Sequence, residues 1–252
     1  MHVVKITVTL ALLLVSCATA SSLAAEAHVA VAANFSGPME RITPLFEKAS
    51  GHKLIIAYGT VGKFYAQIKN GAPFELLVSA DDATPIRLEK DGLAISESRF
   101  TYAFGKLVLW SARPGVVDDK GEVLKRGNFK RLAIANPKMA VYGAAAMEVI
   151  KKLGAAEQLQ ARFVFGENIS QAYQFVATGN AEIGFVALSQ IYKDGVYAAG
   201  SHWLIPATLY PQIKQDVVLL TRGKDNPAAK AFLAFLKGPE ARKVIRAYGY
   251  EL

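Results

Sequence analysis

The sequence predicts an α/β fold in two similar halves, and three observations support this. Short apolar runs alternate with segments of helical spacing from residue 28 onward, which indicates parallel strands with helices on both faces. A polar stretch at 113–115 interrupts this alternation, which then begins again. The chain has 252 residues, 52% of them hydrophobic, so it can bury a substantial core. Two such halves suggest two lobes with a ligand cleft between them.

Residues 1–27 are predicted to be an export signal. Lys5 precedes an apolar run at 6–15, and small residues suited to cleavage follow. The run is too short to span a bilayer. The sequence that ends at Cys17 resembles the bacterial lipobox, in which the cysteine carries lipid, so a lipid anchor is an alternative to a soluble form. Cys17 is the only cysteine, so no disulfide is expected.

A strand, a short turn and a helix begin the first half. Residues 28–33 form an apolar run typical of a buried strand, and 34–37 form a polar turn. Pro38 suits the first position of a helix that Gly51 ends. Pro44 is expected to bend this helix or to end its first turn. Such a turn presents backbone N–H groups and the positive end of the helix dipole, which favours an anion.

The remaining elements follow the same alternation. Further strands are predicted at 53–57, 75–79, 131–135, 163–165, 182–187 and 216–221, with a longer apolar run at 102–110. Further helices are predicted at 64–70, 84–90, 144–153, 170–178, 227–236 and 239–247.

Patterns typical of metal sites and of common hydrolases are absent from the sequence. No two of the four histidines are spaced i, i+4, and none has a cysteine partner, so a zinc site is not expected. There is no G-x-S-x-G elbow, and residues 59–63 lack the spacing of a Walker loop. Asp81 and Asp82 are expected to cap the next helix.

The formal net charge is +8, and the basic residues are spread along the chain. This pattern predicts a solvated basic surface, with acidic partners or attraction of anionic ligands as the alternatives. Nucleic-acid binding is not expected, because no run of five or more basic residues occurs.

Neutral hydrogen-bond donors recur where predicted strands meet predicted helices. They include Asn34 and Ser36 in the first turn, Thr60 in the second, Tyr142 in the third and residues 168–170 in the fourth. Each one alone would be expected to act as a helix cap. Together they would form a binding site only if the four turns converge.

The order of these turns resembles the periplasmic molybdate-binding proteins of ABC transporters. The similarity covers nearly all of the chain after the signal and is carried by short motifs: 31–35, 37–39, 58–63, 66–68, 71–73, 79–81, 136–137, 142–143, 210–211, 235–240 and 248–249.

This resemblance implies a type II periplasmic binding protein fold, with two α/β lobes joined by crossing strands near Phe104 and Val217. Lobe I is expected at 28–105 and 217–252, and lobe II at 106–216. The implied protein is a periplasmic monomer that is not an enzyme and carries no cofactor. It captures molybdate or tungstate and delivers the oxyanion to a membrane permease with a cytoplasmic ATPase.

The resemblance also implies which residues hold the oxyanion, without direct ligation of molybdenum. They are Asn34, with the N–H of Ala33 or Phe35 nearby, Thr60, the N–H of Val61, Tyr142 through its hydroxyl or backbone, and the N–H of Ile169. Some relatives use a tyrosine where this chain has Ala187, and Tyr142 is expected to substitute for it.

Three alternatives stay open. The ligand could be another oxyanion, such as phosphate or sulfate. It could be ferric iron, for which Tyr192 and Tyr197 are candidate ligands. The protein could instead be a secreted enzyme that acts on phosphate esters, although the sequence shows neither a metal cluster nor a nucleophile motif.

Overall fold

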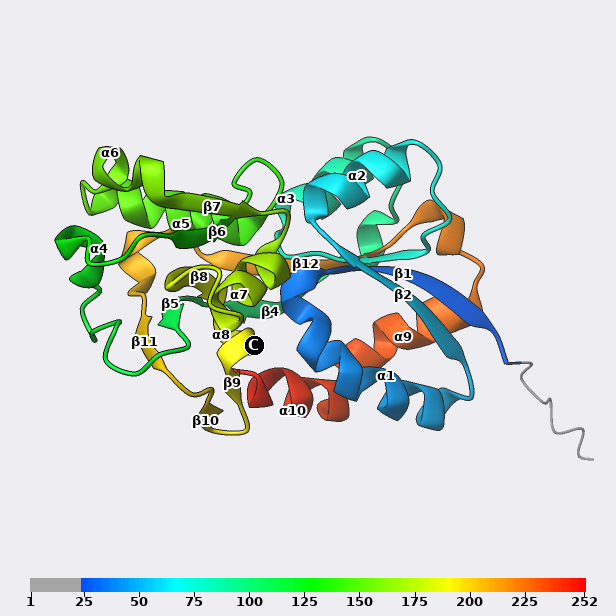
Figure 1. Ribbon diagram of the computed structural model, residues 1–252. Coiled ribbons are helices and arrows are strands. Elements are labelled where there is room, and N and C mark those ends of the chain that lie inside the picture. Colours follow the sequence, from blue (N-terminus) through cyan, green and yellow to red (C-terminus); the bar gives the residue numbers. More distant parts are fainter. Residues whose placement is uncertain (1–23) are drawn as a thin grey trace, which may run out of the picture.

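The computed structural model describes residues 24–252, which form two α/β lobes, each built on a five-stranded sheet (Figure 1). Cys17 and most of the predicted export signal lie outside these residues. None of the helices formed by 24–252 has both the length and the apolar composition needed to cross a membrane.

The first lobe contains a sheet in the order β2-β1-β3-β12-β4. Its strands are β1 (Glu26–Ala32), β2 (Lys53–Gly59), β3 (Leu76–Val78), β4 (Phe100–Gly105) and β12 (Ile213–Leu219). Its helices are α1 (Ser36–Ser50), α2 (Val61–Lys69), α3 (Ala83–Lys90), α9 (Pro227–Lys237) and α10 (Pro239–Ala247). Helices α2 and α3 cover one face of the sheet, and α1, α9 and α10 cover the other (Figure 1).

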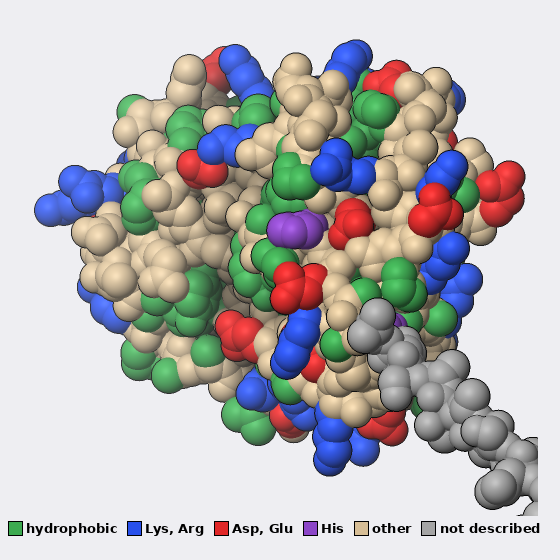
Figure 2. All heavy atoms as spheres, turned by 90° about the vertical axis from the view of Figure 1, so that its right-hand side faces the viewer, with side chains coloured by type: hydrophobic (Ala, Val, Ile, Leu, Met, Phe, Trp, Pro, Cys, Tyr) green, Lys and Arg blue, Asp and Glu red, His purple; other side chains and the backbone are tan. Residues whose placement is uncertain are grey.

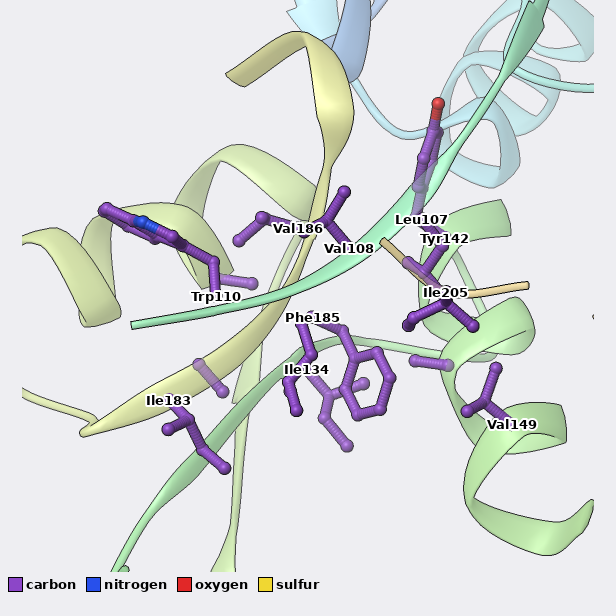
Figure 3. Close-up of a cluster of buried hydrophobic side chains, with 14 of the residues drawn as sticks. Leu107, Val108, Trp110, Ile134, Tyr142, Val149, Ile183, Phe185, Val186 and Ile205 are labelled. Carbon is purple, nitrogen blue, oxygen red and sulfur yellow. The ribbon is translucent and has the colours of Figure 1, made fainter. Parts of the chain in front are cut away.

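The second lobe contains a sheet in the order β11-β5-β8-β6-β7. Its strands are β5 (Leu107–Ser111), β6 (Leu132–Ala135), β7 (Phe163–Gly166), β8 (Ile183–Ala187) and β11 (Ser201–Leu204), with a separate hairpin of β9 (Tyr192–Lys193) and β10 (Val196–Tyr197). Its helices are α4 (Val123–Arg126), α5 (Val141–Lys152), α6 (Ala156–Leu159), α7 (Ile169–Ala177) and α8 (Leu188–Ile191). Figure 3 shows the apolar side chains that pack between β5, β6, β8 and α5.

Local sequence signals explain several element boundaries. Gly51 ends α1 with a φ of 73°, as predicted, because glycine adopts the left-handed conformation without a Cβ clash. Asn226 accepts hydrogen bonds from the N–H groups of Ala228 and Ala229 and so caps α9. Pro44 lies inside α1, which continues to Ser50. Of the two effects predicted for this proline, ending the first turn of the helix is therefore wrong.

Both sheets are mixed rather than parallel. Strand β12 runs antiparallel to β3 and β4, and β5 runs antiparallel to β8 and β11. The reason is that the chain leaves the first lobe through β4 and returns through β12. The apolar run at 102–110 is accordingly two strands, β4 and β5, which separate at Lys106 and belong to different sheets.

Two predicted boundaries need correction. Residues 213–216, which we assigned to lobe II, belong to β12 and pair in the first sheet. The export signal was predicted to extend to residue 27, but Glu26 and Ala27 pair with Lys53 and Leu54 in β1, and Ala27 is fully buried. The fold therefore begins inside the range that we assigned to the signal.

Charged side chains are mixed on the surface of the first lobe. Figure 2 views this lobe from its outer end, where lysine and arginine alternate with aspartate and glutamate. This face shows no basic stripe of the kind that a nucleic-acid backbone requires.

Candidate functional site

A small cavity lies between the two lobes. The first lobe contributes Ala32, Ala33, Asn34, Gly59, Thr60, Val61 and Ala80, and the second contributes Ala140, Val141, Tyr142, Asn168 and Ile169. All six residues predicted to contact an oxyanion therefore line the same space.

The sheets explain why residues so distant in sequence meet. Four strand-to-helix turns face the cavity: those after β1, β2, β6 and β7. In the first sheet Ala32 pairs with Gly59, and in the second Ala135 pairs with Gly166, so the carboxyl ends of neighbouring parallel strands lie level. Each lobe thus presents two adjacent turns to its partner lobe.

Several backbone N–H groups at these turns have no acceptor within residues 24–252. Among the described residues, no hydrogen-bond partner is found for the N–H of Asn34, Val61, Tyr142 or Ile169. Val61 and Ile169 are the first residues of α2 and α7, and Tyr142 is the second of α5. The first N–H groups of a helix lack intrahelical acceptors and lie at the positive end of its dipole. The cavity therefore collects donors suited to an anion.

Among residues 24–252, no ionisable side chain other than Tyr142 lines this cavity, and burial raises the pKa of the Tyr142 hydroxyl well above its ordinary value. Thr60 caps α2 by accepting a hydrogen bond from the N–H of Lys63 at 3.3 Å. Its own hydroxyl hydrogen has no acceptor among the described residues, so Thr60 can cap the helix and donate to a ligand at once.

The Asn34 side chain is committed to the protein. It is 2% exposed, and its Nδ2 donates to Gln215 Oε1 at 2.9 Å and to the Tyr250 hydroxyl at 3.0 Å. Both amide hydrogens are thereby used, so in this arrangement its backbone N–H is the group available to a ligand.

The Tyr142 hydroxyl is in contact with a residue of the first lobe. Figure 3 shows it extending out of the apolar cluster, and it accepts a hydrogen bond from Gln215 Nε2 at 3.2 Å. In the described chain no acceptor is found for the backbone N–H of Tyr142 or for its hydroxyl hydrogen, so both groups remain candidate donors to a ligand. Ala187 does not line the cavity, and its N–H donates to Gln190.

Other candidate groups lie apart from the cavity lining. Tyr192 and Tyr197 pack edge to face at 4.9 Å, and Tyr197 stacks on His202 at 4.0 Å. No group of three or more His, Cys, Asp or Glu side chains within residues 24–252 is arranged to hold a metal ion. Asp81 accepts hydrogen bonds from the N–H and hydroxyl of Thr84, which makes it a cap as predicted, whereas the Asp82 side chain makes no capping hydrogen bond to α3.

Sequence reasoning missed the residues that close and support the cavity. Val141 packs against Ala32, Val61 and Ala80 from the opposite lobe. Gln215 and Tyr250 hold the Asn34 amide from behind. Small apolar residues and a single glutamine in a strand give no local sequence signal that they close or support a cavity.

Two α/β lobes that enclose a cavity lined by uncharged donors, with strands that cross twice between them, define a type II periplasmic binding protein. Comparison with known families agrees, since a model described as "Bacterial extracellular solute-binding protein" matches residues 27–251. The chain belongs to this family.

Individual relatives are similar over almost their full length. The chain is 61% identical to the molybdate-binding protein ModA of Azotobacter vinelandii over 229 residues, which is 91% of each chain. It is 54% identical to ModA of Rhodobacter capsulatus, covering 90% of this chain and 88% of that one. The solved periplasmic molybdate-binding protein of A. vinelandii superposes with a TM-score of 0.87 and 42% identity, covering 90% of this chain and 99% of that one.

Proposed function

We propose that this protein captures molybdate, and also tungstate, between its lobes and delivers the oxyanion to an ABC importer. The observation that carries the proposal is the convergence of four sets of unpartnered backbone N–H groups on one cavity without charged side chains. Relatives named for molybdate binding, at 61% and 54% identity, support this choice of ligand.

Uncharged donors are sufficient to hold a dianion. A hydrogen bond to a charged group contributes about 1.5–3 kcal/mol. Five to seven such bonds would contribute roughly 10–20 kcal/mol before ordering costs, whereas micromolar to nanomolar binding requires about 8–12 kcal/mol. A smaller oxyanion such as sulfate would leave some donors unpaired, and this mismatch is the proposed source of selectivity.

The lobes are in contact around the cavity, as expected for a state that encloses its ligand. Ser170 Oγ of the second lobe donates to the Ala33 carbonyl at 3.2 Å, and the Gly62 N–H donates to the Met139 carbonyl at 3.4 Å. We propose that ligand binding favours this closed arrangement and that the open arrangement admits and releases the oxyanion.

The remaining parts of the proposal concern location and partners. The protein is exported to the periplasm, either soluble or anchored through lipid at Cys17. It acts as a monomer, catalyses no reaction and docks on a membrane permease that a cytoplasmic ATPase drives. Other oxyanions and ferric iron are the competing ligands. No separate observation favours a phosphate-ester enzyme.

Calorimetry with molybdate, tungstate, sulfate, phosphate and ferric citrate tests the ligand. We expect molybdate and tungstate to bind with a Kd of about a micromolar or below, and sulfate at least about a hundredfold more weakly. Equal affinity for sulfate would contradict the proposed selectivity. Native mass spectrometry with the mixed anions provides an independent measurement.

A further inference from the structure

A buried polar cluster lies behind the cavity and joins the two lobes. Gln215 is at its centre: it lies on β12, the strand that returns to the first lobe, and is fully buried. Its Oε1 accepts from Asn34 Nδ2 and from the Tyr102 hydroxyl, both at 2.9 Å. Its Nε2 donates to the Tyr142 hydroxyl at 3.2 Å. One side chain thus contacts a cavity residue from each lobe.

A local irregularity in the sheet allows this arrangement. In the β12–β4 ladder Gln215 pairs with Ala103 and Asp216 pairs with Thr101, so Tyr102 is skipped. A bulge of this kind redirects a side chain, and here the Tyr102 hydroxyl reaches both Gln215 Oε1 and the Ser79 carbonyl.

The neighbouring residue anchors the strand. Asp216 accepts from Arg99 Nη1 and from the Thr101 hydroxyl, each at 2.7 Å. These two bonds hold the backbone beside Gln215 in place. The position of Gln215 is therefore set by the first lobe, while its amide nitrogen reaches into the second.

The chemistry of the cluster requires an amide at this position. Gln215 accepts at one end and donates at the other, and both ends are used. A carboxylate of the same size can accept but not donate, and an apolar side chain can do neither. An apolar replacement leaves buried polar partners of Gln215 unsatisfied, whereas a carboxylate forces the Tyr142 hydroxyl to turn from acceptor to donor and buries a charge behind the cavity.

We propose that Gln215 is a positioning residue for oxyanion capture: it aligns the Asn34 turn of one lobe with the Tyr142 end of α5 in the other. In this way the N–H groups of both turns face the same ligand, and no charge is introduced behind it. This inference rests on the proposed function and adds the residue that couples the two lobes.

The first test is the Gln215→Glu variant, with molybdate affinity measured by calorimetry as a function of pH. At about pH 8 the carboxylate places a negative charge behind the dianion and makes the Tyr142 hydroxyl turn to donate to it, so we expect affinity to fall by more than about tenfold. At about pH 5.5 a buried, protonated carboxyl can donate again, so affinity should partly recover.

The other titratable groups around Gln215 are the same in the wild type and the variant. They are Tyr102, Tyr142 and Tyr250, whose pKa values are raised by burial, Asp81, and Asp216 with its partner Arg99. The matched control is Gln212→Glu, which makes the same charge change at an exposed position outside the cavity lining. We expect the control to follow the wild-type pH profile.

A second test does not depend on a buried charge. Gln215→Met keeps the length of the side chain but removes its hydrogen bonds, and it is combined with Tyr142→Phe in a double-mutant cycle. If Gln215 acts through the Tyr142 hydroxyl, removing that hydroxyl should weaken molybdate binding several-fold in the wild type and hardly at all in the Gln215→Met background. Additive losses would overturn the inference.

The outcomes separate this inference from the proposed function. Failure of the wild type to bind molybdate would refute the proposed function. Wild-type binding together with unchanged affinity and pH profile in Gln215→Glu would refute the positioning role alone. Where Gln215→Glu does not fold, the double-mutant cycle decides.

Discussion

Lys63 on α2 and Glu167 just before α7 form an ion pair between the two lobes, with Nζ and Oε1 2.6 Å apart. The two side chains are 46% and 53% exposed, so water and salt screen their attraction. The ion pair lies beside two cavity-lining turns, but its exposure argues against a large contribution to closure.

We therefore predict a small effect for Glu167→Gln. Exposed ion pairs contribute about 0–1 kcal/mol, so molybdate affinity should change by less than about fivefold at about 0.15 M salt. Calorimetry at low and high ionic strength measures the effect, with Glu157→Gln as the control on an exposed residue without an ion pair in the described chain. A hundredfold loss of molybdate affinity would mean that this ion pair contributes more to binding than its exposure predicts.

Removing a single backbone donor gives a sharper test of the site. Val61 is the first residue of α2, where proline is tolerated, and Thr60 before it has the extended conformation that proline requires (φ −92°, ψ 149°). Val61→Pro should keep the fold and reduce molybdate affinity by about 10–150-fold, the equivalent of one hydrogen bond to an anion.

The control for this variant is Val61→Ala, which trims the side chain but keeps the N–H. Its affinity should stay within a few-fold of the wild type. The Val61 N–H has no acceptor in the described protein, so its removal breaks no hydrogen bond within the fold. Thermal unfolding without ligand checks that Val61→Pro folds. Equal affinity of the proline and alanine variants would exclude this N–H from the site.

Gly105 is predicted to be intolerant of a side chain. It ends β4 at the crossing into β5, and a Cβ there would collide with the Tyr142 hydroxyl and lie 2.5 Å from Gln215 Nε2. Gly105→Ala should therefore disfavour the closed arrangement and lower molybdate affinity by more than about tenfold.

A second substitution tests the cause. Adding Tyr142→Phe to Gly105→Ala removes the hydroxyl that meets the new methyl group, so affinity should rise relative to Gly105→Ala alone. Calorimetry on the two single variants and the double variant measures this coupling. No recovery would mean that the glycine is needed for another reason.

Asn34→Ala is predicted to weaken molybdate binding by more than about tenfold and to destabilise the fold. The substitution removes one buried hydrogen bond from Gln215 Oε1 and one from the Tyr250 hydroxyl, at a cost of about 1–3 kcal/mol. Calorimetry reports the affinity and urea unfolding the stability. An unchanged affinity would remove Asn34 from the site.

Buried tyrosines predict a loss of stability in alkali. Burial is the main cause that raises the pKa of Tyr250 to about 12, and it raises those of Tyr102 and Tyr142 as well. Above about pH 10 the unfolded chain loses tyrosine protons that the folded chain retains, so the free energy of unfolding falls as pH rises from about 10 to 12. Urea unfolding across this range measures the fall, and Tyr250→Phe should reduce it.

Much of the fold was predictable because its signals are local. The turn after β1, the cap at Gly51 and the helix that begins after Asn226 depend on residues a few positions apart. The prediction that six residues share one site came from the order of motifs along the chain, and these residues do line one cavity. Their contact with an oxyanion stays a prediction.

The sequence by itself determined the alternation of strands and helices, the presence of neutral hydrogen-bond donors at the four turns and the resemblance to a family. Only the tertiary structure decided that both sheets are mixed, that the Asn34 amide is occupied by Gln215 and Tyr250, and that the Tyr142 hydroxyl accepts a hydrogen bond from Gln215. The physical reason is range: caps and periodicity act within one turn or strand, whereas these contacts join residues 73 to 216 positions apart.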